Sequence, residues 1–412
     1  MLWQPALPPA YTKATPAELS DRIEAHRREL GDSLIILGHH YQTDEVIAHA
    51  DFTGDSLKLS QLAAQQVSGS GAKYVVFCGV HFMAETADML TPPEVSVILP
   101  DLSAGCSMAD MADYDDAVAA WDVLHRTLSE QHKGKWNGRI IPITYINSTA
   151  AIKAFVGDRG GAVCTSSNAQ FVMQWALAGG TEPKKKGEEI KVLFLPDQHL
   201  GRNTSAQLGL DTDKQTCLYD PRLAAKGEEL GGATPQQVKD ATTILWAGHC
   251  SVHKLFRPEH VRAIRDAEKH LPPAQRTKVL VHPECQKEVV DQADLSGSTE
   301  FIIKTLASAE PGSKWAVGTE THLVSRLARQ CAARDVHVRI LSDCQCLCTT
   351  MYRIDQPHLL WVLDNLAEGR VVNRIMVHAE AKRLALLALD RMLSLTGAAK
   401  PAPVPAEAVT VD

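Results

Sequence analysis

Three cysteines that each follow a short apolar segment are the residues whose types and spacing most directly indicate chemistry. Cys106 comes after SVILPDLSAG, Cys250 after TTILWAGH, and Cys348 ends HVRILSDCQCLC. The chain has ten cysteines in 412 residues, and its start has no basic segment followed by an apolar one. Disulfide frameworks belong mostly to small secreted domains. We therefore expect reduced thiols, which indicate metal ligation or catalysis.

Each of these cysteines ends a series of four segments that occurs three times in the same order. A strand ends in polar residues, small hydroxyl residues then precede a helix, a second strand also ends in polar residues, and a third strand runs into the cysteine. The polar residues of the first step are His39, His40 and Tyr41, then Tyr145 and Asn147, then His282 and Glu284. The hydroxyl residues are Ser56, then Ser166 and Ser167, then Ser298 and Thr299. Generic α/β alternation is the alternative, but it does not explain four ordered steps found three times.

The elements that position these residues are parallel α/β units, because short β-branched segments alternate with amphipathic helical ones. Ligands of such units bind at the carboxyl ends of the strands, so the polar residues of three units are expected to face one cavity. The hydroxyl residues precede helices, where free N–H groups favour phosphate or carboxylate. The middle series is longer, and 202–240 is interpreted as an inserted loop and helix.

The composition excludes some classes of partner. It is 45% hydrophobic and 22% charged, with a net charge of −7 and scattered basic residues. These values argue against a nucleic-acid or anionic-membrane surface but not against a small anionic substrate. No apolar segment approaches the ~20 residues needed to span a bilayer. We expect a cytoplasmic protein without nucleic-acid or membrane partners.

One thiolate from each unit makes three, which suits a [4Fe–4S] cluster with one iron that has no protein ligand. Such an iron is a Lewis acid that binds a substrate oxygen and favours loss of water. Each cysteine also has a structural interpretation, since free cysteines are usually small core residues, and Cys250 could be one beside His253. The core interpretation is preferred for Cys78, Cys164, Cys217, Cys285 and Cys331. Within CQCLC at 344–348, a local metal clip and a redox pair remain open, and the residues alone do not select one thiol.

Two residues are candidates for proton or amine chemistry. Glu284 is the one carboxylate among the first-step residues and is the best general acid/base. Lys153 could act as a Schiff-base amine, but an exposed helical lysine is preferred.

At the ends of the chain, 14–31 is predicted to be a helix with Thr15 as N-cap and Pro16 at N1. Two helical patterns in 356–396 are predicted to pack back on the body.

Several stretches together resemble the quinolinate synthase family, the A protein of bacterial de novo NAD synthesis. They include ILGHHYQTDEVIAHADFTGDSLKLS, LPDLSAGCSMAD, ITYINSTAAIKA, WAGHCSVHKLF and HPECQKEVVDQADLSGST, and they span about residues 30–355. The resemblance implies three pseudo-threefold-related αβα sandwich domains, each of three layers, around a central [4Fe–4S] cluster. The corresponding boundaries are 1–125, 126–265 with the insertion, 266–355, then C-terminal helices at 356–396 and a disordered tail at 397–412.

The resemblance also implies an activity and its residues. The activity is condensation of iminoaspartate with dihydroxyacetone phosphate to quinolinate, phosphate and water, with iminoaspartate supplied by an L-aspartate oxidase that makes transient contact. The implied cluster ligands are Cys106, Cys250 and Cys348, and this likeness is the reason for choosing Cys348. The implied catalytic residues are Tyr41, Tyr145 and Glu284. The implied substrate-binding residues are His39, Ser56, Tyr145, Asn147, Ser166, His282, Glu284 and Thr299.

Two departures and two alternative functions accompany the resemblance. His40 stands where Asn or Tyr is common, which is tolerable if its ring points away from the cavity. The spacing of Cys344, Cys346 and Cys348 differs from the CxxCxxC of some members, so Cys344 and Cys346 receive no role. The alternatives are an iron–sulfur sensor that binds small anions without turnover and an aconitase-like hydratase. A sensor does not need Glu284 and Tyr41 beside an open iron.

Overall fold

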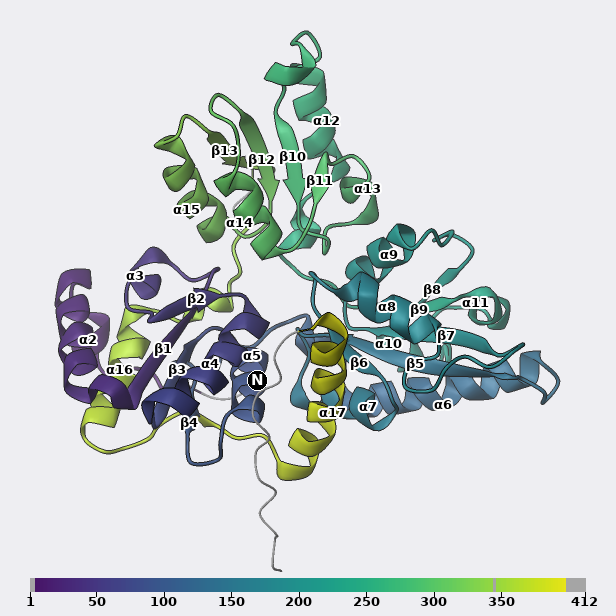
Figure 1. Ribbon diagram of the computed structural model, residues 1–412, viewed down its shortest axis with the longest axis horizontal. Helices are drawn as coiled ribbons and strands as arrows, with labels where there is room; N and C mark the ends of the chain where they lie inside the picture. The colour runs from purple at the N-terminus through teal and green to yellow at the C-terminus, as the bar shows by residue number, and fades with distance from the viewer. Residues whose placement is uncertain (1–3, 344–345, 398–412) are drawn as a thin grey trace, which may run out of the picture.

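The computed structural model describes residues 4–343 and 346–397, which form three sheets surrounded by helices (Figure 1). All the strand pairs are parallel except one. The predicted α/β class and the predominance of parallel strands are confirmed. Parallel strands covered on both faces are continuous apolar segments, and β1 (Leu34–His39), in which all six residues are buried, is an example.

The first sheet has the strand order β14-β4-β3-β1-β2. Its parallel strands after β1 are β2 (Phe52–Gly54), β3 (Tyr74–Cys78) and β4 (Ser96–Ile98). The helices of this part are α1 (Pro9–Thr12), α2 (Pro16–Leu30), α3 (Asp44–Ile47), α4 (Ser56–Ser70) and α5 (His81–Leu90). The predicted start of α2 is confirmed, because Thr15 Oγ1 accepts the N–H of Glu18 while the Glu18 carboxylate accepts the N–H of Thr15.

The second sheet has the strand order β6-β5-β7-β9-β8. Its strands are β5 (Gly138–Tyr145), β6 (Ala162–Cys164), β7 (Glu189–Leu195), β8 (Thr216–Tyr219) and β9 (Thr243–Trp246). Its helices are α6 (Tyr114–Gln131), α7 (Ala150–Asp158), α8 (Ala169–Leu177), α9 (Gln198–Gln207), α10 (Pro221–Ala224) and α11 (Pro235–Asp240). The predicted insertion therefore contains more than a loop and helix, since β8 adds an edge strand to the sheet. This four-residue strand is too short for its periodicity to be recognised.

The third sheet has the strand order β11-β10-β12-β13. Its strands are β10 (Lys278–Val281), β11 (Leu295–Ser296), β12 (Lys314–Gly318) and β13 (His337–Ile340). Its helices are α12 (Pro258–Ala267), α13 (Lys287–Val290), α14 (Thr299–Ala307) and α15 (Thr321–Ala332). In all three sheets the strand that ends in the first-step polar residues lies between the hydroxyl strand and the third-step strand, and the cysteine strand follows. The four-step pattern of the sequence thus corresponds to one strand order used three times.

Short 3-10 helices and the C-terminal segment complete the fold. The 3-10 helices are η1 (Gly31–Ser33), η2 (Ala109–Met111), η3 (His253–Leu255), η4 (Pro273–Gln275) and η5 (Met351–Arg353). The two predicted C-terminal helices are α16 (Gln356–Ala367) and α17 (Ala379–Thr396), and both pack on the body, α16 beside α2 and α17 beside α7 (Figure 1). Between them, β14 (Arg374–Ile375) pairs antiparallel with β4, which the sequence pattern does not indicate. The predicted tail at 397–412 falls almost wholly outside the described residues. A search of the part of the chain that the structure describes finds no helix with the length and apolar character of a membrane span.

The contact between α7 and α17 depends on Gly157. Arg391 of α17 donates to the carbonyl oxygens of Gly157 and Gly161, and a β-carbon at position 157 would collide with the carbonyl oxygen of Leu384. We expect Gly157→Ala to lower the free energy of unfolding by about 1–3 kcal/mol, because the helices must separate. The matched control is Gly69→Ala in α4, where a β-carbon meets nothing within 4 Å, so that change should stabilise by up to about 1 kcal/mol. Denaturant unfolding of both variants measures the difference, and equal stability would show that the contact is not tight.

Candidate active site

A cavity lies where the three sheets face one another, and its wall includes side chains from the carboxyl ends of strands in all three. Every site residue expected from the sequence lines it: His39, Tyr41, Ser56, Cys106, Tyr145, Asn147, Ser166, Cys250, His282, Glu284, Thr299 and Cys348. Residues far apart in the chain thus come together as the rule for parallel strands predicts. The wall also includes residues that the sequence did not indicate, chiefly Asp55, Phe82, Met83 and His253.

The three cysteines of the cavity have the same local structure. Each lies three residues before the start of a 3-10 helix, namely η2, η3 and η5. The sulfur of each accepts a backbone N–H from the first residue of that helix. The carbonyl oxygen of each cysteine accepts the N–H of the second residue of that helix, at 3.0 to 3.1 Å. Backbone N–H groups that point at a sulfur favour the thiolate form, so the three turns are built alike and each partly offsets the cost of burying a thiolate.

These thiols fit an iron–sulfur cluster and the other described cysteines do not. Burial raises the pKa of Cys106 to about 12, with the backbone N–H groups of Ala109 and Met108 opposing it, and a bound cationic metal centre would offset this effect and hold the thiolate. Cys106, Cys250 and Cys348 are half-buried and open to the cavity. Five others are fully buried and do not line it, as expected: Cys78, Cys164, Cys217, Cys285 and Cys331.

Exposure to the cavity also distinguishes two of the three thiols of the CQCLC segment. Cys348 lines the cavity, whereas Cys346 is buried in the core and its sulfur lies 3.1 Å from the hydroxyl of Ser342. Cys344 lies outside the described residues. Alternation along an extended segment is expected to place these side chains on one face, but Cys346 and Cys348 differ in their surroundings because the chain turns at Cys348 into η5.

His39 and His282 occupy equivalent positions and are held in the same tautomer. Nδ1 of His39 accepts the N–H of Tyr41, and Nδ1 of His282 accepts the N–H of Glu284. Each neutral ring therefore carries its proton on Nε2. Burial is the main cause that lowers the pKa of both to about 3; Arg326 adds to the effect at His39, and Glu284 opposes it at His282. At neutral pH both side chains are uncharged N–H donors, which suits the stabilisation of an oxygen that gains negative charge.

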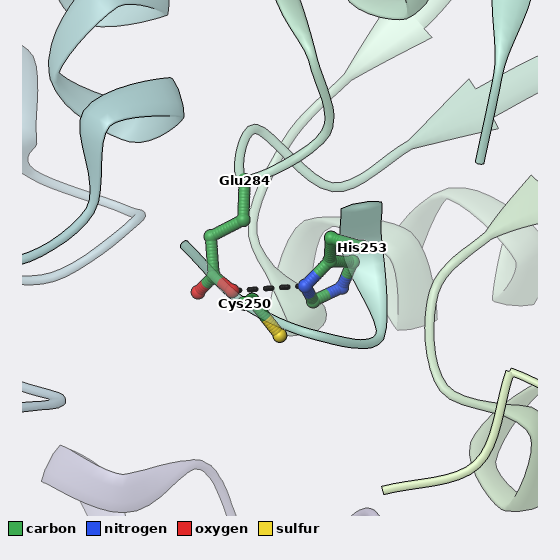
Figure 2. A group of neighbouring side chains, drawn as sticks. All are labelled: Cys250, His253 and Glu284. Carbon is green, nitrogen blue, oxygen red and sulfur yellow. Dashed lines mark hydrogen bonds and ion pairs between the residues drawn. The ribbon is translucent and has the colours of Figure 1, made fainter. Parts of the chain in front are cut away.

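Glu284 is the centre of a buried hydrogen-bond network (Figure 2). Its Oε2 accepts from Nδ1 of His253 at 2.8 Å, and the ring of His253 stacks on that of His282 at 4.5 Å between centroids. Burial raises the pKa of Glu284, but attraction to His253 and His282 and hydrogen bonds from His253 and Tyr145 outweigh it and lower the pKa to about 2. The carboxylate is therefore ionised at neutral pH. It raises the pKa of Tyr145 well above the usual value, after burial as the main cause.

Cys250, His253 and Glu284 could also be considered as ligands of one metal ion, since one potential ligand atom of each lies within 4.8 Å of the others. Figure 2 shows His253 and Glu284 facing each other, with Cys250 beside them. Both ring nitrogens of His253 already have partners, Nδ1 with Glu284 and Nε2 with Thr319 at 3.2 Å. A ligand nitrogen must be free to donate its lone pair to the metal, so this group is better explained as a hydrogen-bonded acid/base pair beside a thiol.

The hydroxyl residues lie at helix starts, as the sequence indicates. Ser56 is the first residue of α4, Thr299 is the first residue of α14, and Ser166 precedes α8. The cap of α4 is Asp55, whose carboxylate accepts the N–H of Lys58. Burial raises the pKa of Asp55, with this N–H opposing it. Asp55 was not predicted, although its place next to Ser56 in DFTGDS is a typical N-cap signal.

Comparison with known proteins identifies the group to which this chain is related. Residues 21–394 match the family described as "Quinolinate synthetase A protein". The chain belongs to that family. It is 50% identical to a quinolinate synthase of Acidobacterium capsulatum over 94% of this chain and 95% of the relative. It is 48% identical to one of Rhodopirellula baltica over 92% and 91%, and 50% identical to one of Streptomyces coelicolor over 92% and 88%. The resemblance stated from the motifs is thus confirmed, and the family is one of enzymes.

One interpretation of a quinolinate synthetase motif, ITYINSTAAIKA, is wrong. Lys153 was expected to be an exposed helical lysine, but it is fully buried. Its Nζ donates to the carbonyl oxygen of Ser148 and lies 5.5 Å from the centre of the Phe82 ring. Burial lowers the pKa of Lys153 to about 8, while Glu85 and Cys106 oppose this effect. The helix α7 is covered on both sides, by the sheet and by the first unit and α17, and a single helical pattern does not reveal a second covered face.

Two further residues of this quinolinate synthetase site, His253 and Asp197, were not predicted as site residues, and the orientation of His40 was left open. His253 carries a local signal, since it follows Cys250 by three residues in WAGHCSVHKLF. Asp197 is fully buried and accepts the N–H of Cys250 at 3.2 Å, so a second-sheet carboxylate supports the cysteine turn. His40, the departure noted in the sequence, does not line the cavity, and its Nε2 lies 3.3 Å from Glu300.

Proposed function

We propose that this protein is a quinolinate synthase that condenses iminoaspartate with dihydroxyacetone phosphate to give quinolinate, phosphate and water, in de novo NAD biosynthesis. The observation that carries the proposal is the convergence of three identically built cysteine turns, one per sheet, on a cavity lined by Glu284, Tyr41 and Tyr145. The identity of the relatives over almost the whole chain supports it. The proposed cofactor is a [4Fe–4S] cluster held by Cys106, Cys250 and Cys348.

The proposed domain organisation follows the three sheets. Residues 1–125, 126–265 and 266–355 would be αβα sandwich domains related by pseudo-threefold symmetry around the iron–sulfur cluster, with 356–396 packed against them. The common strand order of the three sheets and the common offset of the cysteine turns support this organisation.

The roles of the polar residues follow from their charges and partners. The Nε2–H groups of His39 and His282, together with Asn147, are proposed to bind carbonyl and carboxylate oxygens of the substrates. The hydroxyls of Ser56, Ser166 and Thr299, at helix starts, are proposed to bind the phosphate. When bound, the iron–sulfur cluster supplies a Lewis-acidic iron that favours loss of water.

Glu284 is proposed to take a proton from the carbon that attacks or from the hydroxyl that leaves, since its carboxylate is ionised and lines the cavity. Tyr145 and Tyr41 hold protonated phenols, because burial and the charge of Glu284 raise the pKa of both. They are proposed to orient the condensing molecules and to donate protons to them.

The protein would act in the cytoplasm, and a transient contact with L-aspartate oxidase would be detected by co-sedimentation of the two purified enzymes.

Anaerobic incubation of the purified, cluster-loaded protein with iminoaspartate and dihydroxyacetone phosphate tests the activity. We expect quinolinate and an equal amount of phosphate, with no product when either substrate is omitted. No quinolinate from protein with an intact iron–sulfur cluster would contradict the proposal and favour the small-anion sensor. Dehydration of a hydroxy acid without dihydroxyacetone phosphate would instead favour the aconitase-like hydratase.

A further inference from the structure

Thr319 lies just outside the cavity wall, directly after β12, and touches two residues of the wall. Its side chain is fully buried. Its Oγ1 lies 3.0 Å from the hydroxyl of Tyr41 and 3.2 Å from Nε2 of His253. Tyr41 comes from the first sheet and His253 from the loop after the second, so one hydroxyl of the third unit joins residues of the other two.

The hydrogen bonds of this group form one connected series. Glu284 is ionised, so Nδ1 of His253 carries a proton and donates it to the carboxylate. The other ring nitrogen, Nε2, lies 3.2 Å from the hydroxyl of Thr319, and that hydroxyl also contacts the phenol of Tyr41. A continuous series of contacts therefore runs from Tyr41 through Thr319 and His253 to Glu284.

Tyr145 reaches the same carboxylate directly. Hydrogen bonds join its phenol to Glu284 and to the hydroxyl of Ser166. The two tyrosines of the cavity are thus connected to one base by different routes, one direct and one through Thr319. Tyr41 has one other hydroxyl partner, Thr299, at 3.3 Å, and that contact does not lead to Glu284.

We propose, on the basis of the proposed function, that Thr319 is a positioning residue that orients Tyr41 and couples it to Glu284 through His253. The Tyr41 phenol must point at the substrate to give its proton, and the Thr319 hydroxyl, 3.0 Å away, fixes the position of the phenol oxygen. The same hydroxyl contacts His253, which in turn holds Glu284. Loss of this one group would therefore disturb both the proposed proton donor and the proposed base.

The central test compares Thr319→Val with Thr319→Ser in the cluster-loaded enzyme. Valine keeps the shape of threonine but has no hydroxyl, whereas serine keeps the hydroxyl. We expect the valine variant to lose kcat by about tenfold to a hundredfold with KM changed by less than about threefold, and the serine variant to recover most of kcat. Thr243→Val is the matched control, because Thr243 is a fully buried strand residue that does not line the cavity and whose hydroxyl lies 3.2 Å from that of Ser205.

A double variant distinguishes coupling from a packing defect. In a Tyr41→Phe background the link is already broken, so adding Thr319→Val should lower kcat by less than about twofold further. Iron content and thermal unfolding verify that each variant retains its fold and its iron–sulfur cluster. Wild-type kcat in Thr319→Val, equal losses in the serine and valine variants, or full additivity with Tyr41→Phe would each overturn the inference.

A spectroscopic readout separates this inference from the proposed function. With tyrosine labelled by carbon-13 at Cζ, the Tyr41 signal is the one absent from Tyr41→Phe. We expect this signal to shift in Thr319→Val, to return in Thr319→Ser and to stay in place in Thr243→Val, because the shift of Cζ reports hydrogen bonding at the phenol. An unmoved signal in Thr319→Val overturns the inference even if quinolinate is formed. If the signal moves but the wild-type enzyme forms no quinolinate, the hydrogen bond between Thr319 and Tyr41 is supported. The proposed reaction, and the coupling role that rests on it, are then rejected.

Discussion

Replacing Cys250 with alanine is expected to abolish binding of the iron–sulfur cluster. A cubane held by three thiolates loses one of its three attachments, and the remaining two leave two irons without a protein ligand. Cys250 cannot be replaced by a neighbour, because the nearby His253 is bound through both ring nitrogens to Glu284 and Thr319. After anaerobic reconstitution, iron and sulfide should fall from about four of each per chain to near zero, and the visible absorption band should disappear.

Cys285→Ala is the matched control for this experiment. Cys285 directly follows Glu284 in the sequence, but it is fully buried, and its sulfur contacts the carbonyl oxygen of Gly318 at 3.8 Å. It does not line the cavity. We expect its variant to bind iron as the wild type does, with a small loss of stability from the missing sulfur. Unchanged iron in Cys250→Ala, or loss of iron in Cys285→Ala with the fold intact, would contradict the ligand assignment.

Glu284→Gln is expected to lower kcat by about 10²- to 10⁴-fold while the iron–sulfur cluster remains bound. Glutamine has nearly the same shape, but it cannot take up a proton at neutral pH. Its amide also replaces one carboxylate oxygen with an NH2 group, which cannot accept a hydrogen bond from His253 or Tyr145. Steady-state quinolinate formation, together with iron analysis of the same samples, measures the effect.

The control for Glu284→Gln is another shielded carboxylate. Glu188 is 8% exposed and accepts from Arg139 at 2.7 Å, far from the cavity wall. Glu188→Gln removes a charge and an ion pair of the second sheet, and it should retain quinolinate formation. If Glu284→Gln keeps more than about a tenth of wild-type kcat, Glu284 is not the general base.

The sequence predicts the composition of the cavity wall better than the connections within it. Side chains such as His39, Tyr145 and His282 follow apolar strands directly, and parallel strands end at one edge of a sheet, so their convergence follows from a general rule. Thr319 has no such signal. It is recognised only through contacts with Tyr41 and His253, which are far from it in the chain and come from other sheets.

The misjudged elements share a physical cause. The edge strands β8 and β14 are too short for a period-two pattern, and pairing with a longer neighbour determines their conformation. Lys153 was placed on an exposed face because one helix pattern does not show how many partners cover the helix. Tertiary contacts override local propensity in such cases, and these contacts cannot be obtained from one segment considered alone.

The likeness of the three cysteine turns has a consequence for how a reactant is oriented. In the proposed iron–sulfur cluster, three equivalent thiolate ligands would surround the metal nearly alike, so by themselves they would not favour one orientation of a bound molecule. Handedness must come from the unlike strand ends: imidazole donors at His39 and His282 on two sides, and the phenol and amide of Tyr145 and Asn147 on the third. Exchanging side chains among these three strand ends, with the thiols untouched, would therefore alter which end of a reactant meets the metal.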